Sequence, residues 1–395
     1  MNVSALSRWI IEHATGSDDW HGLLDGTCRA LVAMDLPLWR VSLGTMTLDP
    51  STRAFSLHWY TGQGVSAWRP DPHGPVREAA FQRSPIQTLV QRGENIGRWR
   101  LDALRTDNDL PLLHELRAQG GADYVLHRFA FAPGTALTGG MISFATQHAS
   151  GFTEADLAAI EALRPALGLA MAKLNLSQTL REVLSIYVGR TTGARVLEGQ
   201  IRRGQGRTVP AAILFMDLRG FTTLTDRNDP LAVVGWLDEH FDALGKPVTE
   251  RGGEILKFVG DGFLAIFPIQ DPAARPCSVC DDALDAATDA LHANTALNAR
   301  RQTANLPELA ADLVLHFGEV VYGNVGSDRR LDFTVIGRAV NEASRIEGQC
   351  EALGRALLIS DAFAARCGRP LEEVGTVRLR GLANPQRVWS VASLF

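Results

Sequence analysis

The chain lacks the features that mark several common classes of protein. Its 395 residues include only five cysteines, an odd number without regular spacing, which excludes a disulfide-stapled fold and favours a reducing compartment. No apolar run reaches the ~18 residues that a membrane-spanning helix needs. Glu12 and His13 interrupt the apolar residues at the N-terminus, which therefore does not resemble a secretion signal. We expect a cytoplasmic protein without a transmembrane segment.

An excess of positive charge is also missing. The 39 Lys and Arg residues are outnumbered by 44 Asp and Glu residues, which gives a formal net charge of −5. A protein whose main work is to bind a phosphate backbone usually has a basic surface, so we expect no nucleic-acid partner. The length and the apolar content of 46% predict two or three globular domains.

The sequence divides into three zones: residues 1–175, 176–207 and 208–395. The first holds six of the eight tryptophans and shows strand patterns at 54–60, 124–131 and 141–145, followed by a helix capped by Thr153. This order predicts an α+β domain. The third zone alternates apolar strand patterns with helical patterns, which predicts an α/β domain.

The middle zone predicts a helical linker. At the end of the first zone, Ile160, Leu167 and Leu174 stand seven residues apart, and the apolar stripe continues into the middle zone through Leu180, Leu184 and Tyr187. In a dimer this stripe is able to pair as a parallel coiled coil. Pro165 argues against one unbroken helix, because proline removes a backbone donor. The linker is interpreted either as a solvated connection or as a transducer helix.

The end of the first zone carries a distinct pattern. Residues 140–145 read GMISFA, and residues 151–157 read GFTEADL. This stretch resembles the end of a GAF-type sensor domain. The resemblance implies that residues 1–175 regulate the rest of the chain in response to an unidentified small molecule or protein. A PAS-like domain or a purely structural domain is the alternative interpretation.

Two carboxylates follow apolar runs in the third zone. Residues 215–222 read FMDLRGFT, so that Asp217 ends a predicted strand. Forty-four residues later, Asp261 stands in the hairpin turn of residues 257–262, KFVGDG. Mg²⁺ prefers oxygen ligands and takes substrate phosphates and water as further ligands. Together the two residues predict a divalent-metal site, whereas either aspartate alone is more typical of a turn.

A predicted helix brings a second pair of residues together. Within residues 332–345, DFTVIGRAVNEASR, Asn341 and Arg345 are four apart and share one helix face. Arginine offers a fixed fork of donors to phosphoryl oxygens, and asparagine is able to hold a ribose oxygen. An ordinary helix with a solvated arginine is the plain alternative.

These three segments are together similar to the signature segments of the class III nucleotide cyclases, in the same order and spacing. The resemblance covers residues 208–395 and implies a ferredoxin-like domain that works as a head-to-tail homodimer with composite sites. It implies that ATP is converted to 3′,5′-cyclic AMP and pyrophosphate by in-line attack of the ribose 3′-OH, with two Mg²⁺ or Mn²⁺ ions per site. The metal-binding carboxylates then come from one subunit, and the asparagine and arginine from the other.

The resemblance also implies a role for individual residues. It places Asp217, Leu218 and Asp261 at the metal ions, Asn341 at the ribose and Arg345 at the charge of the transition state. The remaining substrate-binding positions are Phe221, Thr222, Lys257, Thr334 and Arg380. Many family members carry aspartate where this chain has Thr334. Arg380 is the residue of this chain nearest in sequence to the position of the family's triphosphate-binding lysine, and it is a candidate for that role.

The base-selecting pair favours adenine over guanine. Lys257 only donates hydrogen bonds, and adenine N1 accepts one, whereas guanine N1 carries a hydrogen. The Thr334 hydroxyl is able to accept from adenine N6. Because an unpaired buried donor costs ~1–3 kcal/mol, we expect ATP to be preferred to GTP.

Two alternative functions stay open. One is a guanylate cyclase, and the other is a catalytically idle nucleotide-binding signalling module, against which the presence of both carboxylates, Asn341 and Arg345 argues. Cys277 and Cys280 form a CxxC pair without the second pair that a structural zinc site normally needs. We therefore assign no metal or redox role to these cysteines.

Overall fold

The computed structural model describes residues 2–50, 52–105, 110–131, 139–202, 204, 206–271, 273, 275, 277–327, 331–382 and 384–392. The contacts within the chain divide it into two compact units, Met1–Ile186 and Tyr187–Phe395. Among these described residues, no helix is long and apolar enough to cross a membrane.

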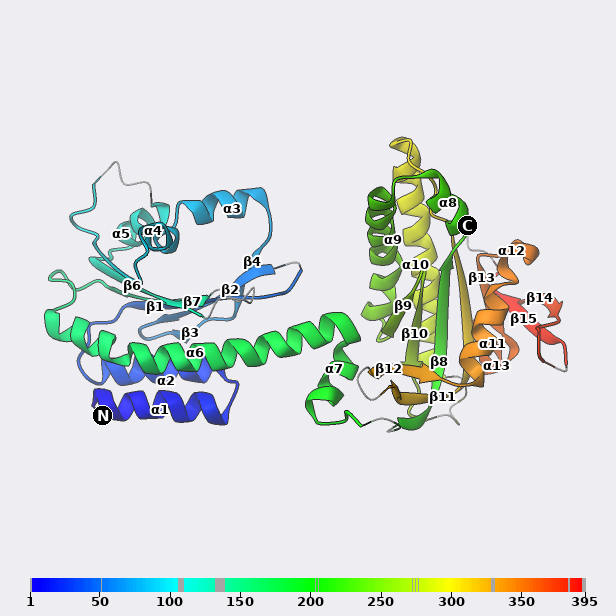
Figure 1. Cartoon of the computed structure of the whole chain (residues 1–395), viewed down its shortest axis with the longest axis horizontal. Coiled ribbons are helices and arrows are strands. Elements are labelled where there is room, and N and C mark those ends of the chain that lie inside the picture. The colour runs from blue at the N-terminus through cyan, green and yellow to red at the C-terminus, as the bar shows by residue number, and fades with distance from the viewer. Residues whose placement is uncertain are drawn as a thin grey trace. The chain divides into compact units, whose positions relative to one another are not determined.

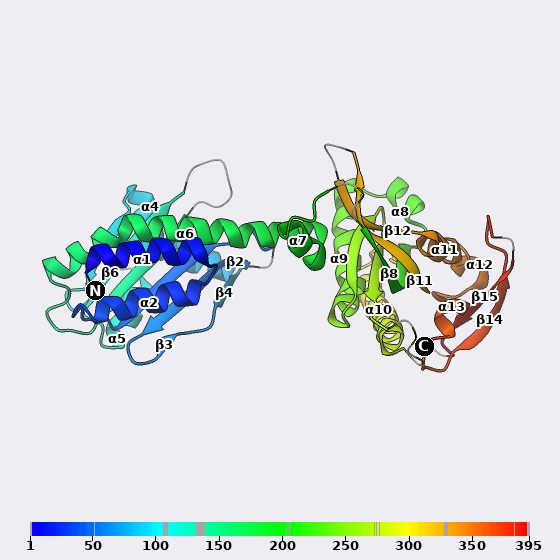
Figure 2. The same cartoon turned by 90° about the horizontal axis from the view of Figure 1, so that it is seen from below.

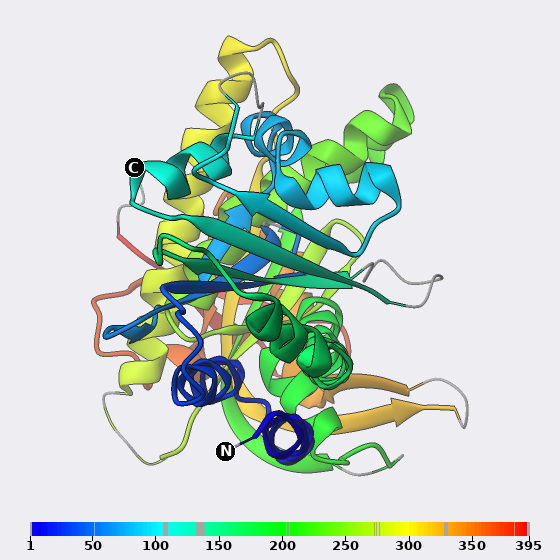
Figure 3. The same cartoon turned by 90° about the vertical axis from the view of Figure 1, so that its left-hand side faces the viewer.

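The N-terminal unit is an antiparallel sheet with helices on both faces. Its strands are β1 (Arg40–Met46), β2 (Thr52–Tyr60), β3 (Gly64–Val65), β4 (Arg69–Pro72), β5 (Ile96–Arg100), β6 (Asp123–Ala130) and β7 (Gly139–Thr146). Its helices are α1 (Val3–Gly16), α2 (Trp20–Val32), α3 (Pro75–Gln82), α4 (Pro85–Arg92), α5 (Pro111–Ala118) and α6 (Glu154–Val188). The strand order is β3-β2-β1-β7-β6-β5, with β4 beside β2. Helices α1, α2 and α6 cover one face, and α3, α4 and α5 lie over the other (Figures 1 and 3).

Each face of this sheet has its own hydrophobic core. Successive residues of a strand point to opposite faces, so β6 contributes Val125 to the core under α1, α2 and α6. The same strand contributes Tyr124 and Leu126 to the core under α4 and α5. Strands β2, β6 and β7 confirm the strands predicted at 54–60, 124–131 and 141–145. Because helices cover both faces of the sheet, both sides of its strands carry apolar residues, and the unit is an α/β layer structure.

Helix α6 begins where the sequence predicts it but continues further than expected. The Thr153 hydroxyl accepts a hydrogen bond from the Asp156 N–H at 3.2 Å, and the Asp156 carboxylate accepts one from the Thr153 N–H at 2.8 Å. The expectation that Pro165 interrupts the helix is wrong, because α6 runs through it. Leu163 and Leu167 are buried on either side of the proline, and this packing outweighs the loss of one backbone hydrogen bond.

The apolar stripe expected to form a coiled-coil seam is corrected by the structure. Ile160, Leu167 and Leu174 are fully buried in the core of their own unit. Leu180 and Tyr187, which continue the expected stripe, are instead 49% and 82% exposed, and the exposed Leu169 and Leu176 lie on the same helix face as these two. A seven-residue repeat fits packing against a sheet as well as packing against a second helix, so the spacing alone did not distinguish the two.

The C-terminal unit is a second sheet. Its strands are β8 (Gly206–Leu218), β9 (Glu254–Val259), β10 (Gly262–Pro268), β11 (Ala311–Gly326), β12 (Leu331–Ile336), β13 (Leu357–Ser360), β14 (Glu372–Val377) and β15 (Gln386–Ser390). Its helices are α7 (Arg190–Leu197), α8 (Phe221–Arg227), α9 (Pro230–Glu250), α10 (Ser278–Thr303), α11 (Arg338–Glu347), α12 (Cys350–Leu353) and α13 (Asp361–Ala364). Strand β12 pairs with β11 (Figure 2), and the order β14-β15-β13-β11-β8-β10-β9 contains the ferredoxin-like arrangement β11-β8-β10-β9.

The central strand β8 separates the two cores of this unit. Ala212, Leu214 and Met216 point into the core under α9 and α10. Ala211 and Ile213 point into the other core, which α11 covers. By the same alternation, the residue that follows Met216 lies on the α11 face. The alternation therefore decides on which side of the sheet the strand presents Asp217.

A matched pair of substitutions on α6 tests the corrected assignment. We expect Leu167→Ala to lower the free energy of unfolding of the N-terminal unit by about 2–5 kcal/mol, because it opens a cavity in the core. Leu167 is 1% exposed, whereas Leu176 is 64% exposed. Leu176→Ala should therefore change the free energy of unfolding by at most about 0.5 kcal/mol. Urea denaturation followed by circular dichroism measures both, and equal losses would contradict the assignment.

Candidate active site

Asp217 and Asp261 are brought together where β8 ends beside the β9–β10 hairpin. The hairpin turns through Gly260, which has a positive φ of 63°. A Cβ atom at Gly262 would clash with the Met216 carbonyl oxygen and lie 2.8 Å from Asp217 Oδ1. Only glycine allows the hairpin to approach the end of β8 this closely. The tip that carries Asp261 is thereby held against Asp217.

The electrostatics of the pair fit a divalent cation. Burial and, to a smaller extent, the nearby charge of Asp261 together raise the pKa of Asp217 to about 6. Burial also raises the pKa of Asp261. Two partly buried carboxylates that repel each other are relieved by a cation bound between them. Within the described part of the chain, no three His, Cys, Asp or Glu side chains are arranged to hold a metal ion, so Mg²⁺ at this pair would need ligands from a substrate or water.

Two further carboxylates surround the pair, and sequence analysis missed both. Asp312 lies opposite Asp217 in the β8–β11 register, and its carboxylate accepts a hydrogen bond from Arg219 Nε at 3.1 Å. Glu347 ends α11, and burial together with the charges of Asp217, Asp312 and Asp261 raises its pKa to about 7. An acidic residue at the start of an otherwise apolar strand was the available signal for Asp312. Glu347 carried no signal, because only the packing of α11 on the sheet brings it here.

The other residues expected near the metal and phosphates offer mainly backbone groups. Leu218 is buried in an apolar cluster, and the half-buried Phe221 packs against it. Their side chains therefore have no role in binding a charged group. Thr222 is exposed at the start of α8, where its carbonyl oxygen accepts a hydrogen bond from the Thr225 hydroxyl at 2.9 Å.

The two residues expected to select the base lie on strands that contact each other, β9 and β12. The β9–β10 register shifts next to Lys257, and such a bulge redirects the neighbouring side chains. Thr334 is 6% exposed, and its hydroxyl has no hydrogen-bond partner among the residues that the structure describes. A buried hydroxyl without a partner is costly, so this one fits a hydrogen bond to a bound group.

Asn341 and Arg345 lie on the exposed face of α11, while Ala343 and Ile346 bury the opposite face against the sheet. The expected i, i+4 arrangement on a helix is confirmed. The Arg345 guanidinium lies against Gly381, whose Cβ position is 3.6 Å from Nη1. Arg380, which is exposed, precedes this glycine. The structure thus brings Arg345 to the turn that carries Arg380.

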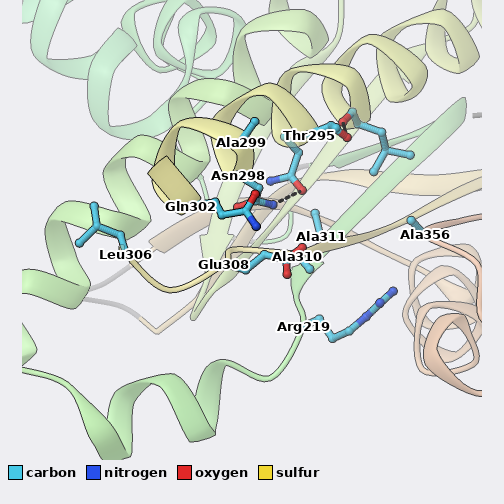
Figure 4. Close-up of a pocket in the computed structure, with 12 residues that line it drawn as sticks. Arg219, Thr295, Asn298, Ala299, Gln302, Leu306, Glu308, Ala310, Ala311 and Ala356 are labelled. Carbon is cyan, nitrogen blue, oxygen red and sulfur yellow. Dashed lines mark hydrogen bonds between the residues drawn. The ribbon is translucent and has the colours of Figure 1, made fainter. Parts of the chain in front are cut away.

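A cavity of about 510 Å³ opens beside the end of β8, between α10 and the segment before β11 (Figure 4). Its asparagines already have partners. Asn294 and Asn298 both donate to the Leu309 carbonyl oxygen, and Asn298 Oδ1 accepts from the Leu309 N–H at 2.9 Å. We therefore assign no substrate to this cavity.

The five cysteines are all free thiols. Cys277 occupies the N-cap position of α10 without a side-chain capping bond, and Cys280 lies in the first turn. Burial raises the pKa of the Cys280 thiol, and the nearby Cys277 contributes to the shift. A thiol whose pKa is raised is a poor nucleophile, so nothing at this pair supports redox chemistry.

Comparison with known proteins finds a family match within the C-terminal unit. Residues 205–389 match the family model described as the adenylate and guanylate cyclase catalytic domain. An adenylate cyclase of Anabaena cylindrica is 34% identical over 43% of this chain and 33% of its own length. Adenylate cyclase 1 of Rhizobium meliloti is 32% identical over 46% of this chain and 27% of its own length. The chain thus spans about a third or less of the length of these curated relatives.

One solved structure is similar over most of the chain. A bacterial light-regulated adenylyl cyclase covers 89% of this chain and 93% of its own, with a TM-score of 0.50 and 16% identity. At this identity the similarity concerns the fold alone.

The raised pKa of Asp217 predicts how stability depends on pH without metal. The pKa of the Asp217 carboxyl group is about 6 in the folded protein, against an ordinary value of 3.8. As pH rises from 4 to 6, the unfolded chain loses the proton of this carboxyl group while the folded protein still holds it, so the free energy of unfolding falls and folding is penalised. Asp217→Asn removes the penalty. In EDTA, the variant's gain in melting temperature over the parent protein should therefore be larger at pH 7.5 than at pH 4.5, by a few degrees (~2–4 °C per kcal/mol).

Differential scanning calorimetry of the C-terminal transition measures this gain. Asp226→Asn is the matched control, because Asp226 is exposed on α8. An equal gain at both pH values, or the same behaviour in the control, would show that Asp217 does not bear the penalty.

Proposed function

We propose that this chain, whose residues 205–389 match the adenylate and guanylate cyclase catalytic domain, is an adenylate cyclase that converts ATP to 3′,5′-cyclic AMP and pyrophosphate. The observation that carries the proposal is the pairing of Asp217 with Asp261. A hairpin glycine holds the two carboxylates together, and their burial and mutual repulsion favour a divalent cation. Both curated relatives compared above are named adenylate cyclases.

The proposed reaction needs little covalent chemistry from the protein. Asp217 and Asp261, with the backbone at Leu218, would hold two Mg²⁺ or Mn²⁺ ions, which when bound supply charge neutralisation and a more acidic ribose 3′-OH. Asn341 orients the ribose so that its 3′ oxygen lies in line with the α-phosphorus. Arg345 binds the charge that grows on the α-phosphate while pyrophosphate leaves.

The proposed site is shared by two copies of the chain. Asn341 and Arg345 face outward from their own unit, whereas Asp217 lies at the end of β8 and Asp261 at the neighbouring hairpin tip. Next to Asp261 the hairpin exposes large apolar side chains, with Phe258 56% and Val259 47% exposed. Apolar side chains gathered beside a polar site are typical of an interaction surface. A head-to-tail homodimer would cover them and complete each site with the partner's Asn341 and Arg345.

Adenine specificity is proposed from Lys257 and Thr334. The partnerless Thr334 hydroxyl is able to accept a hydrogen bond from adenine N6, and the Lys257 ammonium is able to donate to N1. Arg380, beside Arg345, is the proposed triphosphate-binding cation, and the backbone at Phe221 and Thr222 is proposed to contact the phosphates.

For the rest of the chain we propose a GAF-like sensor over residues 1–175, a helical transducer over 176–207 and the catalytic domain over 208–395. The N-terminal sheet, covered by helices on both faces and closed by α6, supports this division. The signal that the sensor receives is proposed to be a small molecule or a protein in the cytoplasm.

Subunit mixing tests the shared site. Asp217→Ala and Arg345→Ala should each reduce cyclic AMP formation by at least ~100-fold, since each removes one half of both sites. A mixture of the two variants should regain activity, because one site of each heterodimer then has an intact carboxylate pair and an intact arginine. Asp226→Ala, on exposed α8, is the control and should keep full activity.

Cyclic AMP is quantified by chromatography after subunit exchange has been verified with differently tagged chains. A mixture that exchanges subunits and stays inactive would rule out the shared site. Near-full activity of Asp217→Ala would rule out the metal assignment.

Base selection is tested by one isosteric substitution. Thr334→Val removes the hydroxyl but keeps the side-chain shape, so kcat/KM for ATP should fall by roughly fivefold, corresponding to about 1 kcal/mol. Turnover of GTP should not fall to the same extent. Thr376→Val on β14, where the threonine is exposed, is the matched control. Equal losses for ATP and GTP would show that Thr334 does not read the base.

A further inference from the structure

Helix α7 is built into the C-terminal unit. Gly189, which separates it from α6, has a positive φ of 86° and lies against the first residues of β9. Its Cβ position is 3.2 Å from Glu254 Oε1 and 3.5 Å from the Ile255 carbonyl oxygen. Thr192, in the first turn of α7, is fully buried. The first turn of α7 is therefore packed on the sheet and is not a solvated linker.

A closed set of hydrogen bonds joins α7 to two strands. The Tyr322 hydroxyl donates its one hydrogen to Glu254 Oε2 at 3.2 Å, so its oxygen accepts from the Thr192 hydroxyl at 2.9 Å. The Thr192 N–H donates to Glu254 Oε1 at 3.3 Å. Both carboxylate oxygens of Glu254 thus have a partner. We call these three residues the Thr192–Tyr322–Glu254 triad.

The surroundings of Tyr322 keep its hydroxyl a donor. Burial raises the pKa of Tyr322 to about 12, so the hydroxyl is protonated at neutral pH. The Arg195 guanidinium, also on α7, lies 4.6 Å from the centre of the tyrosine ring.

A second contact with β11 follows α7. The Asn324 side chain donates to the Gln200 carbonyl oxygen at 2.8 Å, and the Asn324 carbonyl oxygen accepts from the Gly204 N–H at 3.2 Å. The segment after α6 is thus fixed to β11 at two places.

The triad touches both strands that carry the base-selecting residues. Glu254 is the first residue of β9, three positions before Lys257. The Tyr322 ring packs edge-on against Phe333, with ring centroids 4.7 Å apart, and Phe333 immediately precedes Thr334 on β12. A shift of α7 would therefore act on both strands at once.

We propose that the Thr192–Tyr322–Glu254 triad positions β9 and β12 for base recognition, so that α7 adjusts how Lys257 and Thr334 meet the nucleobase. Apolar packing alone would hold α7 in place, whereas directional hydrogen bonds also fix its orientation relative to both strands. Because α7 follows α6 in the chain, the triad lies on the covalent path from the N-terminal unit to the base-selecting strands. The inference rests on the proposed function, since it concerns the same nucleotide site.

Two substitutions in the full-length chain test the positioning role. Tyr322→Phe removes the hydroxyl but keeps the ring on Phe333, and Thr192→Val removes the other hydroxyl but keeps the N–H. We expect each to reduce the preference for ATP over GTP by roughly 3–10-fold, with the change in KM rather than in kcat. The double variant should lose no more than the more affected single variant, because both changes break one network.

The preference is measured twice, as a ratio of kcat/KM values and as a ratio of affinities for non-reactive ATP and GTP analogues by calorimetry. Tyr60→Phe is the matched control, because the Tyr60 hydroxyl bonds Arg40 within the N-terminal unit. The control should leave both ratios unchanged.

The outcomes separate this inference from the proposed function. If the parent protein makes no cyclic nucleotide, the proposed function fails, and the ratio of affinities still decides the role of the triad. If both triad variants lower kcat and thermal stability with an unchanged ratio, the triad is only structural and the inference is overturned. Additive losses in the double variant would overturn it as well.

Discussion

The repulsion between Asp217 and Asp261 is the constraint on which the proposed site depends. Two carboxylates brought together and partly buried raise each other's free energy, and this cost is offset by the two cores of the C-terminal unit. The close approach of Gly262 to the end of β8 fixes the pair in place. The sheet thus maintains a concentration of negative charge that the isolated chain would avoid, and a cation with a nucleotide would remove that cost.

The same packing makes the Asp217–Asp261 pair and the Asn341–Arg345 pair of one chain face in different directions. Strand β8 presents Asp217 on the face that α11 covers, and α11 buries Ala343 and Ile346 against that face. Asn341 and Arg345 consequently point away from the sheet. Because α11 packs one face against the sheet, its opposite face cannot also point toward β8 of the same chain. This geometry is the physical reason for proposing that a second copy completes the site.

The segment between the two sheets shows how polar and apolar packing divide their tasks. Ile160, Leu167 and Leu174 of α6, which stand seven residues apart, are used inside the N-terminal core. Beyond Gly189 the contacts become polar and directional, through the Thr192–Tyr322–Glu254 triad. Apolar packing stabilises each unit, whereas the triad specifies an orientation. The proposed regulation makes use of this difference.

The sequence by itself determined the local elements and the pairs that local spacing defines. Alternation predicted the strand that ends at Asp217, and helical spacing predicted that Asn341 and Arg345 share a face, because both patterns depend only on backbone periods of 2 and 3.6 residues. Only the tertiary structure decided which apolar stripe of α6 is buried. It alone placed Asp312 and Glu347 beside the aspartates and closed the bonds of Tyr322, since residues far apart in the chain meet through the order and register of the strands, which no local period encodes.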